Sequence, residues 1–198
     1  MQTNNINCIT KILNRFNIEY KIINSYDDYN DKIIKLIIPG IGNYKSCIEY
    51  IKNNNIDKII KEHNSLNKKI LGICIGMQIL TTCGEESGYT DGLDIIKNSK
   101  TEKIKTESIL PHIGWNSIKL LKEDDDRLFN NINLKSDYYF VHSYNVICED
   151  NNIIMAKTQY NDIEFISIIK TKNILAVQFH PEKSGLNGIK LIGNFLKW

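Results

Sequence analysis

Short apolar runs alternate in the first half of the chain with longer segments whose apolar residues recur every three or four positions. Residues 36–38 and 69–73 are apolar on both faces, which is typical of buried β-strands. Residues 9–16 and 47–60 carry apolar side chains at helical spacing, so each segment predicts a helix. A further helix is expected over residues 76–82, directly after the second strand.

The second half adds strands and a closing helix. Strands are expected over residues 138–141, 153–156, 164–169 and 174–179, and a helix over 186–198. Strands buried on both faces and alternating with helices predict an α/β fold with an open, mainly parallel sheet flanked by helices. Neither a repeat nor a linker interrupts the pattern, so residues 1–198 are expected to form a single domain.

Composition and charge argue against several classes of function, namely those that involve nucleic acids or membranes. Of 198 residues, 42% are hydrophobic and 24% charged, which is an ordinary globular balance. The net charge is +2, and Arg15 and Arg127 are the only arginines, so nucleic acid and anionic membrane surfaces are not expected partners. The sequence has no apolar stretch of the roughly 20 residues that a membrane span needs, and its start lacks the pattern of a secretory signal.

The five cysteines are an odd number without a CxxC pair: Cys8, Cys47, Cys74, Cys83 and Cys148. In a chain of this length they predict free thiols in a reducing cytoplasm, and neither a disulfide framework nor a zinc site. We therefore expect no metal and no cofactor.

Residues 70–78 are the most informative stretch, because they read strand, Gly-x-Cys-x-Gly, helix. Gly72 and Gly76 allow the tight turn of a nucleophile elbow, which would present Cys74 at the carboxyl edge of the sheet. The start of the next helix would lower the pKa of the thiol and stabilise a developing oxyanion. A cysteine between two turn glycines can also be an inert buried residue, so the motif alone leaves both interpretations open.

A nucleophilic cysteine needs a base, and His180 is the best candidate. It ends an apolar strand, Pro181 stops that strand, and Glu182 follows two residues later on the same side of an extended chain. Glu182 can then hold one ring nitrogen while the other faces the thiol, as in a catalytic triad. A strand-end histidine beside an exposed glutamate would be the simpler interpretation if the elbow were absent.

Pro39-Gly40-Ile41-Gly42 is a third element at a strand end. Glycines there allow backbone N–H groups to approach a substrate closely, as an oxyanion hole requires. A plain strand-to-helix turn would look the same.

Taken together, these motifs resemble the class I, triad-type glutamine amidotransferases, which have a flavodoxin-like fold. Within that family, the blocks at residues 39–43, 111–116, 139–144 and 178–184 are similar to the glutaminase subunits of imidazole glycerol phosphate synthase. The resemblance runs from about Asn5 to the C-terminus.

The resemblance implies a reaction and a set of roles. Cys74 would attack the carboxamide of glutamine, His180 would move the proton, and Glu182 would orient His180. Backbone N–H groups around Gly40, Ile41, Gly42 and Ile75 would stabilise the oxyanion, after a rearrangement of the 39–42 segment if needed.

Glutamine itself would be held by four side chains: Gln78, Glu86, Ser143 and Tyr144. Glu86 would pair with the α-ammonium group, although Glu85 is adjacent and a surface carboxylate is the alternative. His142 is expected to be structural or at a subunit interface. The aromatic residues Trp115, Tyr138 and Tyr139 are equally compatible with a core, an interface or a ligand contact.

The resemblance also implies a partner. In the family, ammonia passes into a (β/α)₈-barrel cyclase subunit, HisF, so a heterodimer is expected. Glutamine hydrolysis would be weak until the cyclase and its nucleotide ligand are bound.

One feature departs from the family. Relatives usually begin with an apolar strand and a glycine turn, whereas residues 1–6 resemble only the far end of that turn without its glycines. The first strand is therefore expected to be missing, which would leave a sheet edge exposed.

Three alternatives remain open at this point. A related copy could feed ammonia to a sugar-amidinating synthase in surface-polysaccharide biosynthesis. A non-catalytic scaffold or regulatory subunit could keep the fold without the reaction. A cysteine hydrolase or peptidase could use the same elbow, although the expected glutamine pocket argues against it.

Overall fold

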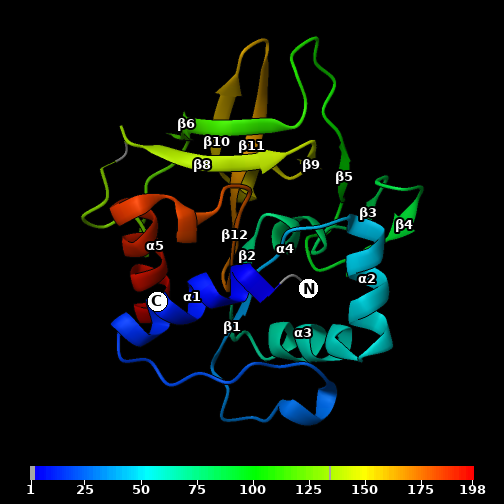
Figure 1. Ribbon diagram of the computed structural model, residues 1–198, viewed down its shortest axis with the longest axis vertical. Helices are drawn as coiled ribbons and strands as arrows, with labels where there is room; N and C mark the ends of the chain where they lie inside the picture. The colour runs from blue at the N-terminus through cyan, green and yellow to red at the C-terminus, as the bar shows by residue number, and fades with distance from the viewer. Residues whose placement is uncertain (1–2, 134) are drawn as a thin grey trace.

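The computed structural model describes residues 3–133 and 135–198, and a six-stranded sheet lies at its centre (Figure 1). In spatial order the strands are β1 (Lys35–Ile38), β2 (Lys69–Ile73), β12 (Ile174–Val177), β11 (Ile163–Lys170), β10 (Ile154–Tyr160) and β7 (Lys119–Leu120). β1, β2 and β12 pair in parallel, and the remaining pairs are antiparallel. The α/β class and the open sheet are confirmed, with the parallel pairing confined to the half of the sheet that carries the elbow.

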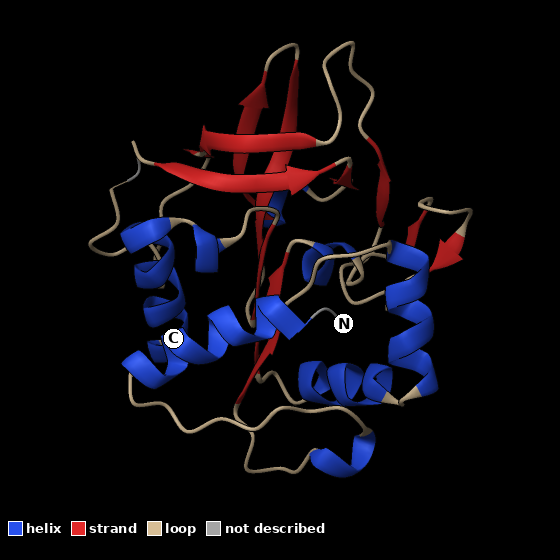
Figure 2. Cartoon of the chain, in the orientation of Figure 1, coloured by secondary structure: helices blue, strands red, loops and turns tan. Residues whose placement is uncertain are grey.

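Helices cover both faces of the parallel half (Figure 2). The apolar side of α1 (Thr3–Arg15) and of α5 (Gly185–Lys197) joins a core that contains Leu71 and Val177. On the other face, α2 (Tyr44–Asn53) and α3 (Ile56–Ser65) pack on a core that contains Ile70 and Ala176. Successive residues of a strand point to opposite faces, which is why β12 and, after Lys69, β2 carry no polar side chain.

Two smaller sheets complete the architecture. One has the order β4 (Thr90–Asp91), β3 (Cys83–Gly84), β5 (Ser99–Lys103) and β9 (Tyr144–Cys148), and the other pairs β6 (His112–Ser117) with β8 (Asp137–His142). In Figure 1 β6 and β8 lie across the upper end of the central sheet. The short helices are η1 (Tyr26–Asp28), α4 (Ile75–Gln78), η2 (Asn151–Ile153) and η3 (Pro181–Lys183).

Several expected boundaries were wrong. Residues 47–60 are two helices rather than one, because the chain breaks at Asn54 and Asn55, and Asn55 adopts the left-handed conformation (φ 55°) that asparagine tolerates. The helix expected over 76–82 ends at Gln78, and the strand expected over 174–179 ends at Val177.

The first strand of the family was expected to be missing, and only part of the N-terminal segment lies within the described residues. Residues 1 and 2, where the turn was expected to begin, lie outside the described residues, and from Thr3 the chain is helical. No strand precedes β1 within the part of the chain that is described, and β1 forms one edge of the sheet, paired with β2 alone.

Residues 3–133 and 135–198 show whether the cysteines are paired, whether metal ligands cluster and whether a helix could span a membrane. All five cysteines lie there and are free thiols. Within the same ranges no three His, Cys, Asp or Glu side chains come together as a metal site requires. None of the helices described is both long and apolar enough to cross a membrane.

Candidate active site

Cys74 occupies a strained turn between β2 and α4. Its backbone has φ 53° and ψ −110°, which is unusual for a residue with a side chain. A Cβ atom at Gly72 would lie 2.7 Å from the Gly76 carbonyl oxygen, and one at Gly76 would lie 1.9 Å from the Ile38 carbonyl oxygen. Both glycines are therefore required by close backbone contacts, as a nucleophile elbow demands.

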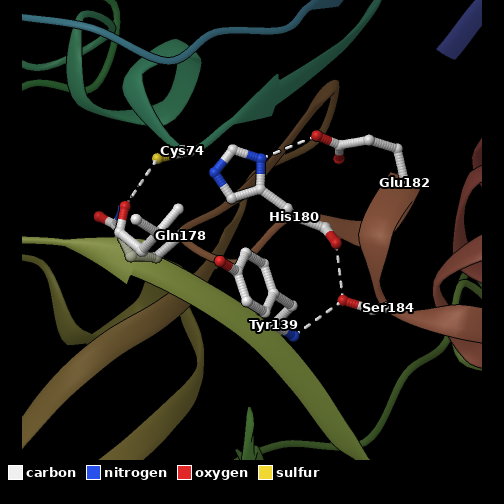
Figure 3. A network of polar contacts seen from close by, with 7 residues as sticks. Cys74, Tyr139, Gln178, His180, Glu182 and Ser184 are labelled. Atoms are coloured by element: carbon white, nitrogen blue, oxygen red, sulfur yellow. Dashed lines mark hydrogen bonds and ion pairs between the residues drawn. The ribbon is translucent and has the colours of Figure 1, made fainter. Parts of the chain in front are cut away.

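The backbone around His180 is anchored to β8. The His180 N–H donates to the Tyr139 carbonyl at 2.9 Å. The Ser184 hydroxyl accepts the Tyr139 N–H at 3.0 Å and donates to the His180 carbonyl at 2.6 Å (Figure 3). These bonds tie β8 to the end of β12 and fix the position of the imidazole.

The imidazole of His180 lies between Cys74 and Glu182 (Figure 3). Its Nδ1 is 2.8 Å from Glu182 Oε1, and both side chains are 0% exposed. A carboxylate oxygen can only accept, so Nδ1 carries a proton and Nε2 is directed to the sulfur. The parallel neighbours β2 and β12 bring the two strand ends together, since the Cys74 N–H donates to the Val177 carbonyl at 2.8 Å.

The environment of His180 favours its charged form. Burial lowers its pKa, but hydrogen bonds and charge interactions with Cys74 and Glu182 outweigh this effect and raise the pKa to about 9. The contacts with Cys74 and Glu182 therefore favour the protonated form of the ring.

A cleft of about 310 Å³ opens over Cys74. Its walls include eight of the predicted site residues: Ile41, Gly42, Cys74, Ile75, Gln78, Glu86, Ser143 and Tyr144. Gly40, His180 and Glu182 lie outside this lining, and Gly40 packs against Ile75 where a Cβ would approach Ile75 Cγ2 to 2.1 Å. A shallower depression of about 640 Å³ between Leu120 and Asn130 contains none of the predicted residues.

Two backbone segments of the expected oxyanion site line the cleft, at Ile41–Gly42 and at Ile75. Ile75 is the first residue of α4, so its N–H has no carbonyl partner within its own helix. Gly42 is also in the lining and has φ 143°, a conformation that favours glycine. This placement is compatible with the oxyanion role expected of the 39–42 segment and Ile75.

Gln78 and Glu86 make specific contacts in the cleft wall. The Gln78 side-chain amide donates to the Tyr144 carbonyl at 3.0 Å. Glu86 Oε2 accepts the Tyr44 N–H at 2.6 Å, at the start of α2. One oxygen of Glu86 therefore fastens α2 to the cleft, which the sequence did not indicate.

Gln178 begins the block at residues 178–184, but the sequence indicated no role for it. Its side chain is 0% exposed, and its Nε2 donates to Cys74 Sγ at 3.6 Å. Its Oε1 accepts from Gln78 Nε2 at 3.1 Å. The only signal for this contact in the sequence was its position directly after the strand that delivers His180.

The remaining candidates divide between core and surface. His142 is buried, and its Nδ1 is 2.8 Å from the Tyr144 carbonyl, as expected for a structural histidine. Tyr138 is buried against Phe179, whereas Trp115 is 54% exposed and packs edge-on against Tyr139.

Comparison with known proteins places these features in a family. The model of the class-I glutamine amidotransferase family matches residues 3–198. The chain is 42% identical over 171 residues to imidazole glycerol phosphate synthase subunit HisH 1 of Campylobacter jejuni, covering 84% of this chain and 82% of that protein. It is 45% identical over 165 residues to the HisH subunit of Methanocaldococcus jannaschii, covering 82% and 80%.

Solved structures agree at the level of the fold. A putative GMP synthase component of Thermoplasma acidophilum matches with a TM-score of 0.73 at 20% identity, covering 100% of this chain and 88% of that one. PurLQS of Thermotoga maritima matches with a TM-score of 0.72 at 18% identity, covering 96% and 91%. The family model spans the described chain and the relatives exceed 40% identity, so this chain belongs to the class-I glutamine amidotransferase family.

Proposed function

We propose that this protein is the glutaminase subunit of an imidazole glycerol phosphate synthase in histidine biosynthesis, and that Cys74, His180 and Glu182 are its catalytic triad. The observation that carries the proposal is the buried Glu182–His180 pair, 2.8 Å apart, directed at the thiol on the floor of the cleft. The names of the curated relatives support the same subunit.

The chemistry follows from these groups. The Cys74 thiolate attacks the side-chain carboxamide carbon of glutamine, and the resulting oxyanion is held by backbone N–H groups. The imidazolium of His180 gives its proton to the departing nitrogen as the C–N bond breaks, which releases ammonia and leaves a glutamyl thioester. His180, now neutral, takes a proton from water, which attacks the thioester and releases glutamate and the thiolate.

The cleft lining supplies the other roles. We assign glutamine binding to Gln78, Glu86, Ser143 and Tyr144, with Glu86 Oε1 available for the α-ammonium group while Oε2 holds α2. The oxyanion donors are assigned to Ile75 and to the backbone of Gly40, Ile41 and Gly42.

The partner is proposed to be a cyclase subunit of the (β/α)₈-barrel type, joined in a heterodimer that receives the ammonia. An exposed apolar face beside the cleft supports a protein contact there. Ile113 is 60% exposed and Trp115 is 54% exposed on β6, and Trp115 packs against Tyr139, which lines the cleft together with Lys183.

We also infer one glutaminase domain over residues 1–198, located in the cytoplasm. The match of the family model to residues 3–198 supports the first inference, and the five free thiols support a reducing compartment.

Glutamate release tests the reaction. The chain is mixed with its cognate cyclase and the nucleotide ligand of that cyclase, and glutamate is measured for wild type, Cys74→Ala and His180→Ala. We expect turnover in the wild type and none above background in either variant. Equal turnover in either variant would refute the triad and would favour a non-catalytic role for this chain.

Complementation tests the pathway. A histidine auxotroph that lacks only its glutaminase subunit is transformed with this gene and the gene for the cognate cyclase. Growth without histidine supports the proposal. Active glutamate release without growth would instead assign the chain to another synthase, such as one that amidinates a surface sugar.

A further inference from the structure

Gln178 connects the sulfur of Cys74 to the wall of the cleft. Its side chain is 0% exposed and lies beside Cys74 (Figure 3), with Nε2 3.6 Å from Cys74 Sγ. Its Oε1 is 3.1 Å from Gln78 Nε2, and the same Gln78 nitrogen is 3.0 Å from the Tyr144 carbonyl oxygen. A continuous chain of polar contacts thus runs from the sulfur to the backbone of Tyr144.

The Tyr144 carbonyl oxygen, at the end of this series of contacts, determines the direction of every hydrogen bond in the series. A backbone carbonyl can only accept, and the Tyr144 oxygen also lies 2.8 Å from His142 Nδ1. Gln78 must therefore present its NH₂ group to Tyr144, and that same group faces Gln178. Gln178 must accept this hydrogen bond with its side-chain carbonyl oxygen, which leaves its own NH₂ group facing Cys74.

The reverse orientation is unfavourable because the site is buried. Gln178 is 0% exposed and Gln78 is 4% exposed. Turning either amide would place two donors or two acceptors face to face without water to compensate, which costs the desolvation of the unpaired groups. The backbone of Tyr144 thus makes Gln178 present a donor, and not an acceptor, to the sulfur, which also lies 3.9 Å from the carbonyl oxygen of Val141.

A donor at the sulfur favours the charged form of the cysteine. An N–H bond to a thiolate is charge-assisted and stronger than the same bond to a neutral thiol. The same donor would stabilise the negative charge on the sulfur when it leaves the tetrahedral intermediate during thioester hydrolysis.

We propose that Gln178 is a catalytic residue that stabilises the Cys74 thiolate by an amide N–H bond, with its orientation set through Gln78 by the Tyr144 carbonyl. The proposal rests on the proposed function, because it assigns a role to the sulfur as nucleophile and leaving group. It adds a second stabilising contact at the sulfur, independent of the imidazolium of His180.

The test follows the ionisation of Cys74 directly. Wild-type protein, Gln178→Met and Gln178→Glu are treated with iodoacetamide over a range of pH, and alkylation of the peptide that carries Cys74 is measured by mass spectrometry. Methionine keeps the length of the side chain but removes both polar atoms. Glutamate keeps the acceptor for Gln78 and places an oxygen at the sulfur in place of the donor.

We expect the midpoint of the alkylation profile to move to higher pH in both variants, by about one pH unit, because a hydrogen bond to a charged group is lost. In the complex with the cyclase, kcat for glutamate release should fall about tenfold or more with a smaller change in KM, since the lost contact is made to the reacting atom and not to bound glutamine.

Asn173→Ala is the matched control. Asn173 is a buried amide at the opposite end of β12, 7% exposed and bonded to Asn64 and the Lys68 carbonyl. This variant should unfold at a lower temperature without any shift of the alkylation profile.

Two results would overturn the proposal. One is an unshifted profile in folded Gln178→Met with wild-type kcat. The other, which applies if Gln178→Met does not fold, is an unshifted profile in Gln178→Glu. A wild-type protein that releases no glutamate would refute the proposed function, and the alkylation experiment would still test the contact at the sulfur.

Discussion

Glu182 Oε1 and His180 Nδ1 are 2.8 Å apart, and neither side chain is exposed to water. Pro181–Lys183 is a 3-10 helix and not the extended chain expected from the sequence, yet the carboxylate two residues from the imidazole still reaches it, so one short segment supplies both the base and the group that orients it. Water cannot replace this contact, so its loss should affect catalysis directly.

Removing the charge of Glu182 tests that dependence. In Glu182→Gln we expect kcat for glutamate release to fall about 10²–10⁴-fold, the range typical of general acid–base catalysis, with little change in KM. Steady-state kinetics of the complex measure both quantities. Glu164→Gln is the control, because Glu164 forms a partly exposed ion pair with Lys157 and should leave kcat unchanged. Wild-type kcat in Glu182→Gln would contradict the role of the pair.

The raised pKa of His180 predicts an alkaline limit for the reaction. Burial lowers this pKa, but contacts with Cys74 and Glu182 raise it to about 9. Above that pH the ring loses the proton that the departing ammonia needs, so kcat should fall as pH rises through about 9. Glu182→Gln removes one of the contacts that raise this pKa, so the alkaline fall in its residual kcat should begin at a lower pH than in the wild type. A wild-type kcat that stays constant well above pH 9 would rule out this assignment.

His63 predicts a loss of stability in acid. Burial lowers its pKa to about 4, and its ring is bonded to the Tyr29 hydroxyl and the Lys69 carbonyl. The unfolded chain, with a histidine pKa near 6.5, binds the proton more readily. The contribution of His63 to the free energy of unfolding is therefore complete above about pH 6.5 and is lost progressively as pH falls toward 4.

Urea unfolding at several pH values measures this effect. His63→Gln can keep both hydrogen bonds but does not titrate, so its stability should decline less than that of wild type between pH 6.5 and 4. The comparison with wild type is essential, because burial also lowers the pKa values of His112 and His142. Parallel pH profiles of the two proteins would contradict the prediction.

The elbow glycines predict a contrast between two alanine substitutions. A Cβ at Gly76 would lie 1.9 Å from the Ile38 carbonyl oxygen, so Gly76→Ala should lower the free energy of unfolding by about 1–3 kcal/mol or more and impair glutamate release. A Cβ at Gly114 meets nothing within 4 Å, so Gly114→Ala should change stability by about 0.5 kcal/mol or less. Equal stabilities in urea unfolding would show that the turn tolerates a side chain.

The parallel half of the fold could be predicted because its strands are buried on both faces. The runs at residues 36–38, 69–73 and 174–177 carry almost only apolar side chains, and each ends at a site residue or at the Pro39–Gly42 segment. Since neighbouring parallel strands end at one edge, the proximity of Cys74 and His180 followed from the pattern.

Apart from β8, which was expected over residues 138–141, the strands of the small sheets were missed because their patterns do not resemble buried strands. β5 has the sequence SKTEK and buries only Ser99 and Thr101. β6 turns His112 inward while Ile113 and Trp115 face outward, the reverse of the usual rule. Hydrogen bonding to neighbouring strands, and not side-chain polarity, determines these elements.

The missed site contacts are all long-range. Gln178 reaches Cys74, and Glu86 reaches the N–H of Tyr44, across separations of 104 and 42 residues. Local periodicity carries no information about such pairs, and an alternation of apolar and polar residues cannot show which buried amide faces a thiol.

Trapping the covalent intermediate tests the central claim most directly. The complex of this chain with its cyclase is mixed with isotopically labelled glutamine, quenched rapidly in acid, digested and examined by mass spectrometry. We predict a labelled glutamyl group on the peptide that contains Cys74, and none in Cys74→Ala. Sustained glutamate release by Cys74→Ala, or a labelled group on another residue, would contradict the account.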